Sequence, residues 1–358
     1  MTHFVLERFY LHGFLNIIIP FVFAIVIFKL VYMRVFGSKF YDYSHYNRNH
    51  RYTFSCMGGV IILFCLVVSV LFSYFFHIFS FNLVLASYIL VPMILLLLFG
   101  LLADYKTLAI EVVLSVQFVI VLVFVKLLDL KMRGLADWFG FEDVGDVMGY
   151  FGAISILFVF TNVLNYLERL DGLVAILSLL IFMFFGLVGF YVNDMVQVVV
   201  NFSFVGIILA FLYFELLSPF KFYLGRGGVY IIGFYMGYQV LLRLNGAHET
   251  LYFLTPTLFL AFFSYPILDA IRVFVLRFLK GISLADMKTL HIHHQLLAIG
   301  LSNSAVSAIV LLYTLGITLF FVFISTWSFV YQFFIGLFIG LFILYMSIFC
   351  LKPAETKT

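Results

Sequence analysis

Residues 162–173 read NVLNYLERLDGL and lie between two stretches long enough to cross a bilayer. Two asparagines, a glutamate, an arginine and an aspartate fall within ten of these residues. Charged groups at membrane depth cost free energy, and the usual reason to keep them is a substrate or ion site lined by several helices. The segment is therefore a candidate for the wall of a functional site.

Four further polar clusters interrupt the apolar sequence and carry residue types able to do similar chemistry. They are DYSHYNRNHRYTFSCMGG (42–59), LLADYKT (101–107), ELLSPFKFYLGRGG (215–228) and ADMKTLHIHHQ (285–295). Any one cluster is explained by loops being polar. Five clusters on one side of the membrane, each with Asp, Asn, His or Gly, instead favour a shared pocket.

The amino-acid composition indicates that these clusters belong to a membrane protein. The chain has 358 residues, of which 65% are hydrophobic and 10% charged, far from the roughly 25% charged residues of soluble domains. Lipid permits only helices or closed barrels, and the apolar runs have helical length. We therefore predict an all-α, polytopic transmembrane helical bundle. The net charge of +3 gives no reason to expect nucleic acid, and the cysteines show neither disulfide nor zinc spacing.

Windows of about 20 apolar residues predict about 11 spans. They start near residues 14, 58, 82, 108, 148, 173, 195, 228, 251, 305 and 328. Most Lys and Arg residues then fall on one side, so the positive-inside rule places the N-terminus outside and the C-terminus in the cytoplasm. We expect a single integral-membrane domain, 1–358, whose site is formed by cytoplasmic loops 35–57, 103–107, 165–172, 215–227 and 272–304.

The segment 271–299 is predicted to contain an interfacial amphipathic helix. Its stretch IRVFVLRFLKGI alternates apolar residues with Arg272, Arg277 and Lys280. Basic side chains on such a helix favour anionic lipid headgroups. We therefore expect these three side chains to face the membrane surface.

The clusters resemble the motifs of the polyprenyl-phosphate N-acetylhexosamine-1-phosphate transferases over nearly the whole chain. Asp42, His50, Gly58 and Gly59 are similar to the D…H…GG pattern after that family's first helix. LLADYK resembles the G-x-x-D-D-Y/R segment, with Asp104 as its second aspartate.

Three later segments extend the resemblance. Asn162, Asn165 and Asp171 are in register with the family motif N-x-x-N-x-x-D-G-x-D-G-L. The stretch SPFKFYLGRGG is similar to the family motif P-A-K-x-F-x-G-D-x-G. The stretch HIHH (291–294) is similar to the family motif H-x-H-H. The histidine motif and the span count favour the family's GlcNAc-type branch.

The resemblance implies transfer of a HexNAc-1-phosphate from a UDP-sugar to undecaprenyl (polyprenyl) phosphate, the first membrane step of a cell-envelope glycan pathway, at the cytoplasmic face of the inner membrane. Joining two anionic phosphates requires charge neutralisation and in-line positioning, so Mg²⁺ or Mn²⁺ is expected.

The implied catalytic residues are Asp104, Asp171, His291, His293 and His294. The implied substrate-binding residues are Asp42, His50, Gly58, Gly59, Lys106, Asn162, Asn165, Lys221 and Arg226. The implied metal ligands are Asp171, Glu168 and Glu215. Homodimers are common in the family.

Each motif also has a simpler interpretation. Asp104 could be a solvated helix end beside Lys106, the asparagines could cap helices, and the glycines could serve close helix packing. The three histidines could form a transition-metal site, although no companion motif supports one.

Two departures from the family pattern leave the activity open. Ala103 stands where the family has an aspartate, and Arg226 replaces the aspartate that the family uses as a magnesium ligand. Arginine cannot coordinate Mg²⁺ but can neutralise phosphate. The chain is therefore either a transferase with a rearranged site or an impaired relative that binds lipid or nucleotide sugar as a regulator or scaffold. A transporter is disfavoured, because transporters carry their ionisable groups near the midplane.

Overall fold

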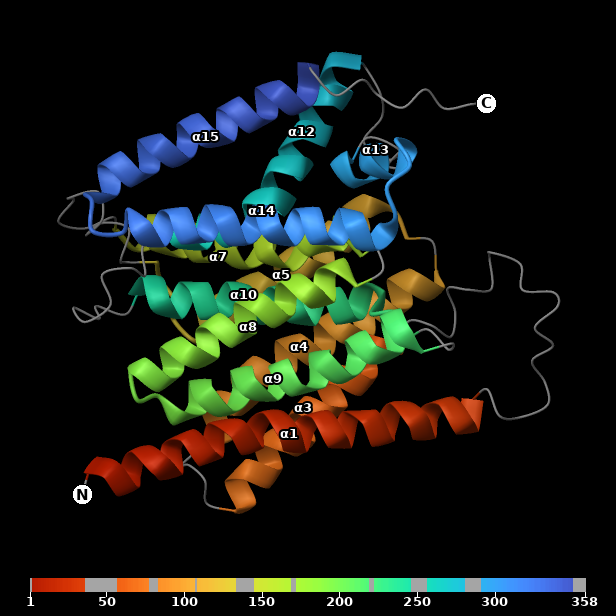
Figure 1. The fold of residues 1–358 in the computed structure, drawn as a ribbon, viewed down its shortest axis with the longest axis vertical. Coiled ribbons are helices and arrows are strands. Elements are labelled where there is room, and N and C mark those ends of the chain that lie inside the picture. Colours follow the sequence, from red (N-terminus) through yellow and green to blue (C-terminus); the bar gives the residue numbers. More distant parts are fainter. Residues whose placement is uncertain are drawn as a thin grey trace. The chain divides into compact units, whose positions relative to one another are not determined.

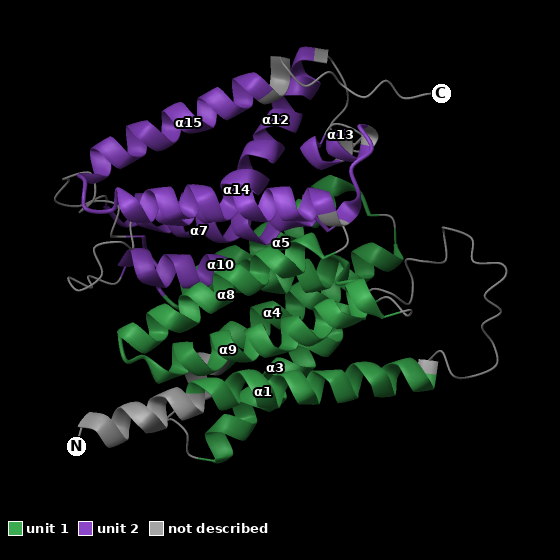
Figure 2. Ribbon diagram, in the orientation of Figure 1, with its two compact units in different colours: residues 1–128, 171–236 green, residues 129–170, 237–358 purple. Residues whose placement is uncertain are grey.

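The computed structural model describes residues 2–35, 57–76, 83–106, 108–132, 145–168, 172–218, 222–245, 256–280 and 291–349. The regular elements in these ranges are helices (Figure 1). They divide into two compact units, each built from two separate stretches of the chain (Figure 2).

The first unit contains residues 1–128 and 171–236. Its elements are α1 (Thr2–Val35), α3 (Gly58–Phe75), α4 (Leu83–Tyr105), α5 (Ile110–Leu127), α8 (Leu173–Tyr191), α9 (Met195–Leu212), η3 (Tyr213–Leu217) and the start of α10 (Gly225–Asn245). Helix α9 packs against α1, α3 and α8. It is the most buried of the candidate spans, so its apolar side chains form the centre of this unit.

The second unit contains residues 129–170 and 237–358. Its elements are α7 (Gly145–Val163), η2 (Leu164–Tyr166), the rest of α10, α11 (Pro256–Phe262), α12 (Ser264–Lys280), α13 (Ile292–Ala298), α14 (Asn303–Phe323) and α15 (Phe329–Phe349). Helix α12 contacts α7, η2, α11, α14 and α15, and the ring centroids of Phe160 and Phe263 lie 4.1 Å apart. Helix α12 thus packs against five other elements of its own unit.

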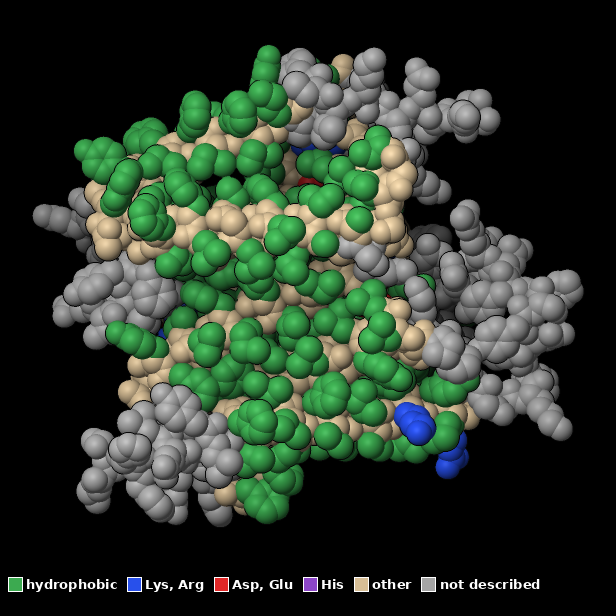
Figure 3. Space-filling view, in the orientation of Figure 1, with side chains coloured by type: hydrophobic (Ala, Val, Ile, Leu, Met, Phe, Trp, Pro, Cys, Tyr) green, Lys and Arg blue, Asp and Glu red, His purple; other side chains and the backbone are tan. Residues whose placement is uncertain are grey.

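The prediction of a polytopic membrane bundle is confirmed. Within the described ranges, nine helices are long and apolar enough to cross a membrane, or ten if the bent pair α11 and α12 counts as one span. The eleven predicted segments coincide with these nine helices, the bent pair and α10, which has 21 residues. On the face drawn in Figure 3, hydrophobic side chains cover most of the described helices. The sidedness of the termini stays a prediction.

The expectation that Arg272 and Arg277 face lipid headgroups is wrong. Their exposed fractions are only 1% and 3%. Residues 264–280 form a helix that turns by 71° from α11 and packs among the helices of its unit. The two arginines of this amphipathic helix therefore point inward, where Arg272 meets the polar side chain of Gln295.

Candidate functional site

In the first unit, Asp104 joins the end of α4 to the start of α10. The backbone N–H of Arg226 donates to Oδ2 of Asp104 over 2.9 Å, and Nε of the same arginine lies 3.5 Å from Oδ1. The Asp104 side chain is 15% exposed and that of Arg226 is 42% exposed. The carboxylate therefore meets both the positive end of a helix dipole and a guanidinium group.

Glycines allow this close arrangement. Gly100 on α4 lies against Gly227, and Gly59 on α3 lies against Gly228, so closely that an added Cβ on either would overlap backbone atoms. The N–H groups of Gly58 and Gly59 donate to the carbonyls of Tyr223 and Leu224 over 3.2 Å and 3.0 Å. Close packing accounts for these glycines, and their predicted contact with substrate stays a prediction.

Glu215 lies in an unusual turn of the first unit. It belongs to the π-helical element η3, in which Ser218 donates its N–H to the carbonyl of Tyr213 over 2.9 Å, and its exposed fraction is 5%. Such π-turns occur often at functional sites.

Gly172 precedes α8 with a φ of +79° and lies against the Leu216 side chain. This backbone conformation and the lack of space explain why a glycine follows the predicted site residue Asp171.

In the second unit, the asparagine segment covers the end of α7 and η2. Asn162 donates its side-chain N–H to the carbonyl of Phe158, one turn earlier, over 2.9 Å. Asn165 lies in η2 and Glu168 in the turn that follows, both half-buried. Because α7 and η2 pack against α12, this segment borders the helix that carries the second polar cluster.

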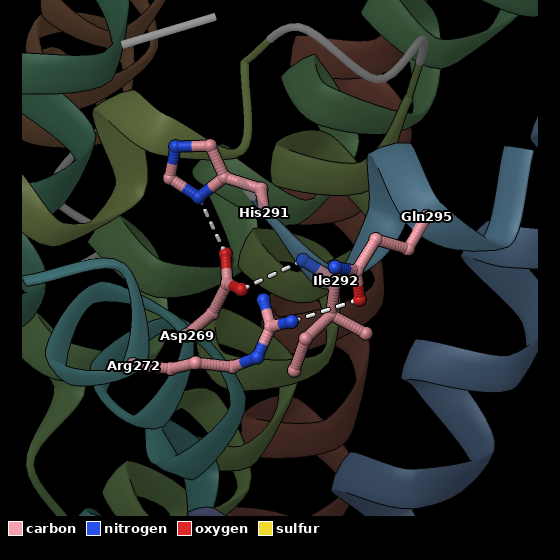
Figure 4. Close-up of polar contacts among 5 residues, drawn as sticks. All are labelled: Asp269, Arg272, His291, Ile292 and Gln295. Atoms are coloured by element: carbon pink, nitrogen blue, oxygen red, sulfur yellow. Dashed lines mark hydrogen bonds and ion pairs between the residues drawn. The ribbon is translucent and has the colours of Figure 1, made fainter. Parts of the chain in front are cut away.

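That second polar cluster surrounds Asp269 on α12 (Figure 4). Oδ2 of Asp269 lies 2.7 Å from Nδ1 of His291, and Oδ1 accepts the N–H of Ile292 over 2.9 Å. The ring of His293 stacks on that of His291 with centroids 5.2 Å apart and planes 10° apart. Asp269, His291 and His293 are all almost completely buried.

Arg272 and Gln295 complete this cluster. One turn after Asp269, the guanidinium of Arg272 donates to Oε1 of Gln295 over 2.8 Å, as Figure 4 shows. Arg272 and Asp269 also attract each other electrostatically. The start and the middle of the short helix α13 are thus tied to α12 through buried polar contacts, which hold the histidine motif against α12.

The buried cluster does not have the donor set of a magnesium site. Asp269, His291 and His293 place possible ligand atoms within 4.8 Å of one another. However, the 2.7 Å between Asp269 and His291 is a hydrogen-bond distance, whereas two ligands of one tetrahedral zinc ion stand about 3.3 Å apart. Magnesium also prefers oxygen ligands alone. The predicted ligands Glu168 and Glu215 belong to different units, so the predicted magnesium set stays a prediction.

Several predicted residues lie outside the described ranges. These are Asp42, His50, Asp171, Lys221 and the side chain of His294. Lys106 is described and is exposed just after α4. Of the predicted residues, the structure brings together Asp104 with Arg226 in one unit and His291 with His293 in the other.

Asp269 is the functional candidate that sequence reasoning missed. It stands in the apolar run SYPILDAIRVFV, which favoured an interfacial helix. A lone carboxylate in such a run is expensive in lipid, and that signal could have identified it as a site residue.

The fold and these two clusters define a polytopic helical membrane protein with paired acidic and basic groups at helix ends. Residues 86–243 match the family model described as glycosyl transferase family 4. The predicted resemblance to this family is therefore confirmed for this segment.

Curated relatives carry related names. The chain is 31% identical over 159 residues to a phospho-N-acetylmuramoyl-pentapeptide-transferase of Listeria welshimeri, covering 44% of this chain and 47% of the relative. It is 22% identical over 268 residues to an undecaprenyl-phosphate alpha-N-acetylglucosaminyl 1-phosphate transferase of Escherichia coli O157:H7, covering 73% and 70%. A Yersinia pestis protein of the latter name is 26% identical over 216 residues, or 58% of each chain. The match to the Listeria protein thus spans about half of that protein's length.

Proposed function

We propose that this chain transfers a HexNAc-1-phosphate from a UDP-sugar to a polyprenyl phosphate such as undecaprenyl phosphate. An oxygen of the lipid phosphate attacks the sugar-linked phosphorus, a new P–O bond forms, and the bond to UMP breaks. The family segment at residues 86–243 and the names of the relatives support this reaction class. The sugar is a GlcNAc-type HexNAc, in line with the longer matches.

The observation that carries the proposal is that motif residues in each unit are held in place by polar contacts with residues distant in the sequence. Asp104 is anchored at the start of α10 by Arg226, and His291 is anchored by a buried carboxylate on α12. Arg226 and Lys106 supply positive charge for the phosphates, since guanidinium groups bind phosphate oxygens bidentately. Asp171, Glu168 and Glu215 are the proposed holders of Mg²⁺ or Mn²⁺, which would neutralise further phosphate charge.

A second candidate function rests on the same ion pair. Because Arg226 already neutralises Asp104, the chain could bind the lipid phosphate or nucleotide sugar without turning it over. It would then act as a regulator or scaffold. The proposed setting in either case is the cytoplasmic face of the inner membrane, where UDP-sugars are found, and a homodimer is compatible with the family.

The test uses the full chain purified in detergent. It is incubated with undecaprenyl phosphate, a panel of UDP-HexNAc donors, and Mg²⁺ or Mn²⁺, and released UMP is measured. The transferase predicts UMP that requires the lipid and disappears with Asp171→Asn. Donor binding without UMP release would favour the second candidate.

A further inference from the structure

We propose that Gly100 on α4 is a positioning residue, which lets the two helices approach so closely that Asp104 reaches the first turn of α10. The inference rests on the proposed function, in which Asp104 is a catalytic candidate. None of the predicted site residues is Gly100. Its role follows from the space that a side chain at this position would need.

Gly100 and Asp104 face the same part of α10. They are four residues apart on α4, so they share one helix face. A Cβ on Gly100 would lie 2.3 Å from both the nitrogen and the Cα of Gly227, and 2.9 Å from the carbonyl carbon of Arg226. One turn later, Asp104 accepts the N–H of Arg226 over 2.9 Å and lies 3.5 Å from its Nε. The backbone separation at Gly100 therefore sets how far the Asp104 side chain has to reach.

The size of the overlap shows that this hydrogen bond depends on the glycine. Ordinary contacts of a Cβ begin at 3.4 Å, so with an alanine at position 100 the two backbones must separate by about 1 Å. The obstructing atoms belong to the backbone of α10, which cannot rotate away as the end of a side chain can. Because a donor–acceptor distance of about 3.6 Å is no longer a hydrogen bond, the same separation breaks the contact of 2.9 Å between Asp104 and Arg226.

This fit links the packing of two apolar helices to the charge at the candidate site. Both carboxylate oxygens of Asp104 meet Arg226, so a shift of α10 moves the carboxylate and the guanidinium relative to each other. A misplacement of about 1 Å costs roughly 100-fold in rate where the displaced group acts on the reacting atoms. Gly100 thus acts on turnover through Asp104, without a contact to substrate.

Gly100→Ala tests the role in the full-length protein in detergent. Arg226 carries one of the first four N–H groups of α10, which have no acceptor within the helix, so hydrogen exchange at its amide reports the bond to Asp104. Exchange should become about 10-fold to 100-fold faster in Gly100→Ala, as expected for loss of a hydrogen bond to a charged group. The kcat for UMP release should fall by about 100-fold.

Asp104→Glu separates positioning from packing. The longer side chain adds one carbon–carbon bond, about 1.5 Å, so on the native backbone it should overshoot Arg226 and lower kcat by about 10-fold or more, although the charge is kept. Combined with Gly100→Ala, the same glutamate should span the widened gap. Amide protection and kcat should then both rise about 10-fold above those of Gly100→Ala alone. A glycine needed only for packing predicts no rescue, because the longer side chain does not remove the overlap.

Gly206→Ala is the matched control. A Cβ on Gly206 of α9 would lie 2.2 Å from the carbonyl oxygen of Ile17 on α1. The variant therefore creates a comparable backbone overlap in the same unit, between helices that carry neither Asp104 nor Arg226. It should lower the thermal midpoint while leaving exchange at the Arg226 amide and kcat unchanged.

Unchanged exchange at the Arg226 amide or unchanged kcat in folded Gly100→Ala would overturn the proposal, as would a double variant no better than Gly100→Ala. If Gly100→Ala does not fold, Asp104→Glu decides by itself, and full amide protection with full kcat in that variant would overturn the proposal. If the wild type releases no UMP, the proposed function fails, whereas the exchange rates of the Arg226 amide still decide whether Gly100 positions Asp104.

Discussion

The carboxylate of Asp104 accepts the backbone N–H of Arg226 over 2.9 Å and lies 3.5 Å from its Nε. Two residues from separate predicted motifs, Asp104 and Arg226, thus form one pair. A partly exposed pair of this kind contributes less than about 1 kcal/mol to stability. Its main effect is local, because it sets the charge at the junction of α4 and α10.

Asp104→Asn should abolish most of the activity while the protein stays folded. An asparagine oxygen still accepts the N–H of Arg226, but the negative charge is lost, and we expect kcat to fall on the order of 100-fold, as for loss of a charged group that acts in the transition state. The measurements are UMP release and the thermal midpoint in detergent.

Asp194→Asn provides the comparison. Asp194 accepts the N–H of Gln197 over 3.1 Å at the start of α9, and asparagine caps helices as well as aspartate does. This variant should keep both activity and stability. Equal, full activity in the two variants would show that Asp104 acts only as a helix cap.

Arg226→Asp should lower turnover rather than restore it. In the proposed site the guanidinium neutralises phosphate, and loss of a charged hydrogen bond costs about 1.5–3 kcal/mol, or roughly 10-fold to 100-fold in rate. Arg226→Lys keeps the charge and should lose less. A gain of UMP release in Arg226→Asp would instead show that the native residue blocks the reaction, and would support the impaired relative.

The helices were largely readable from the sequence. Apolar runs of spanning length predict helices wherever they occur, since lipid leaves few alternatives, and each predicted segment coincides with a helix or with the bent pair. The direction of α12 was not readable. Apolar and basic residues alternate along it in a manner typical of a surface helix, and only its packing shows that Arg272 points inward.

Gly59→Ala should destabilise the first unit. An added methyl group would overlap the backbone of Gly228, and overpacking of this kind costs about 1–3 kcal/mol. The thermal midpoint in detergent should fall. Gly316→Ala on α14 is the control because open space surrounds that position, and an unchanged midpoint in both variants would contradict the close packing of α3 and α10.

Arg272→Gln should destabilise the protein whatever the lipid. The buried guanidinium holds Gln295 and balances Asp269, and breaking a buried charge pair costs about 3 kcal/mol or more. Lys29→Gln, at an exposed position on α1, should have little effect. A loss of stability for Arg272→Gln that occurs only in bilayers with anionic lipid would instead show that Arg272 contacts lipid headgroups.

The site was only partly readable from the sequence. Motif spacing identified Asp104, Arg226, His291 and His293, but spacing does not reveal partners distant in the chain. Asp269 lies 22 residues before His291, with neither a repeat nor a motif to connect them. The packing of the start of α13 against α12 brings the two together, and spacing along the chain does not predict that contact.

The most direct test of the transferase follows the two phosphorus atoms of the donor. Purified protein is given undecaprenyl phosphate and UDP-GlcNAc labelled with ³²P at either the α or the β phosphorus, and the lipid is extracted. Transfer of sugar-1-phosphate predicts β label in the lipid fraction and α label in UMP. Retention of both labels in UDP-GlcNAc, with the donor bound to the protein, would contradict the central claim.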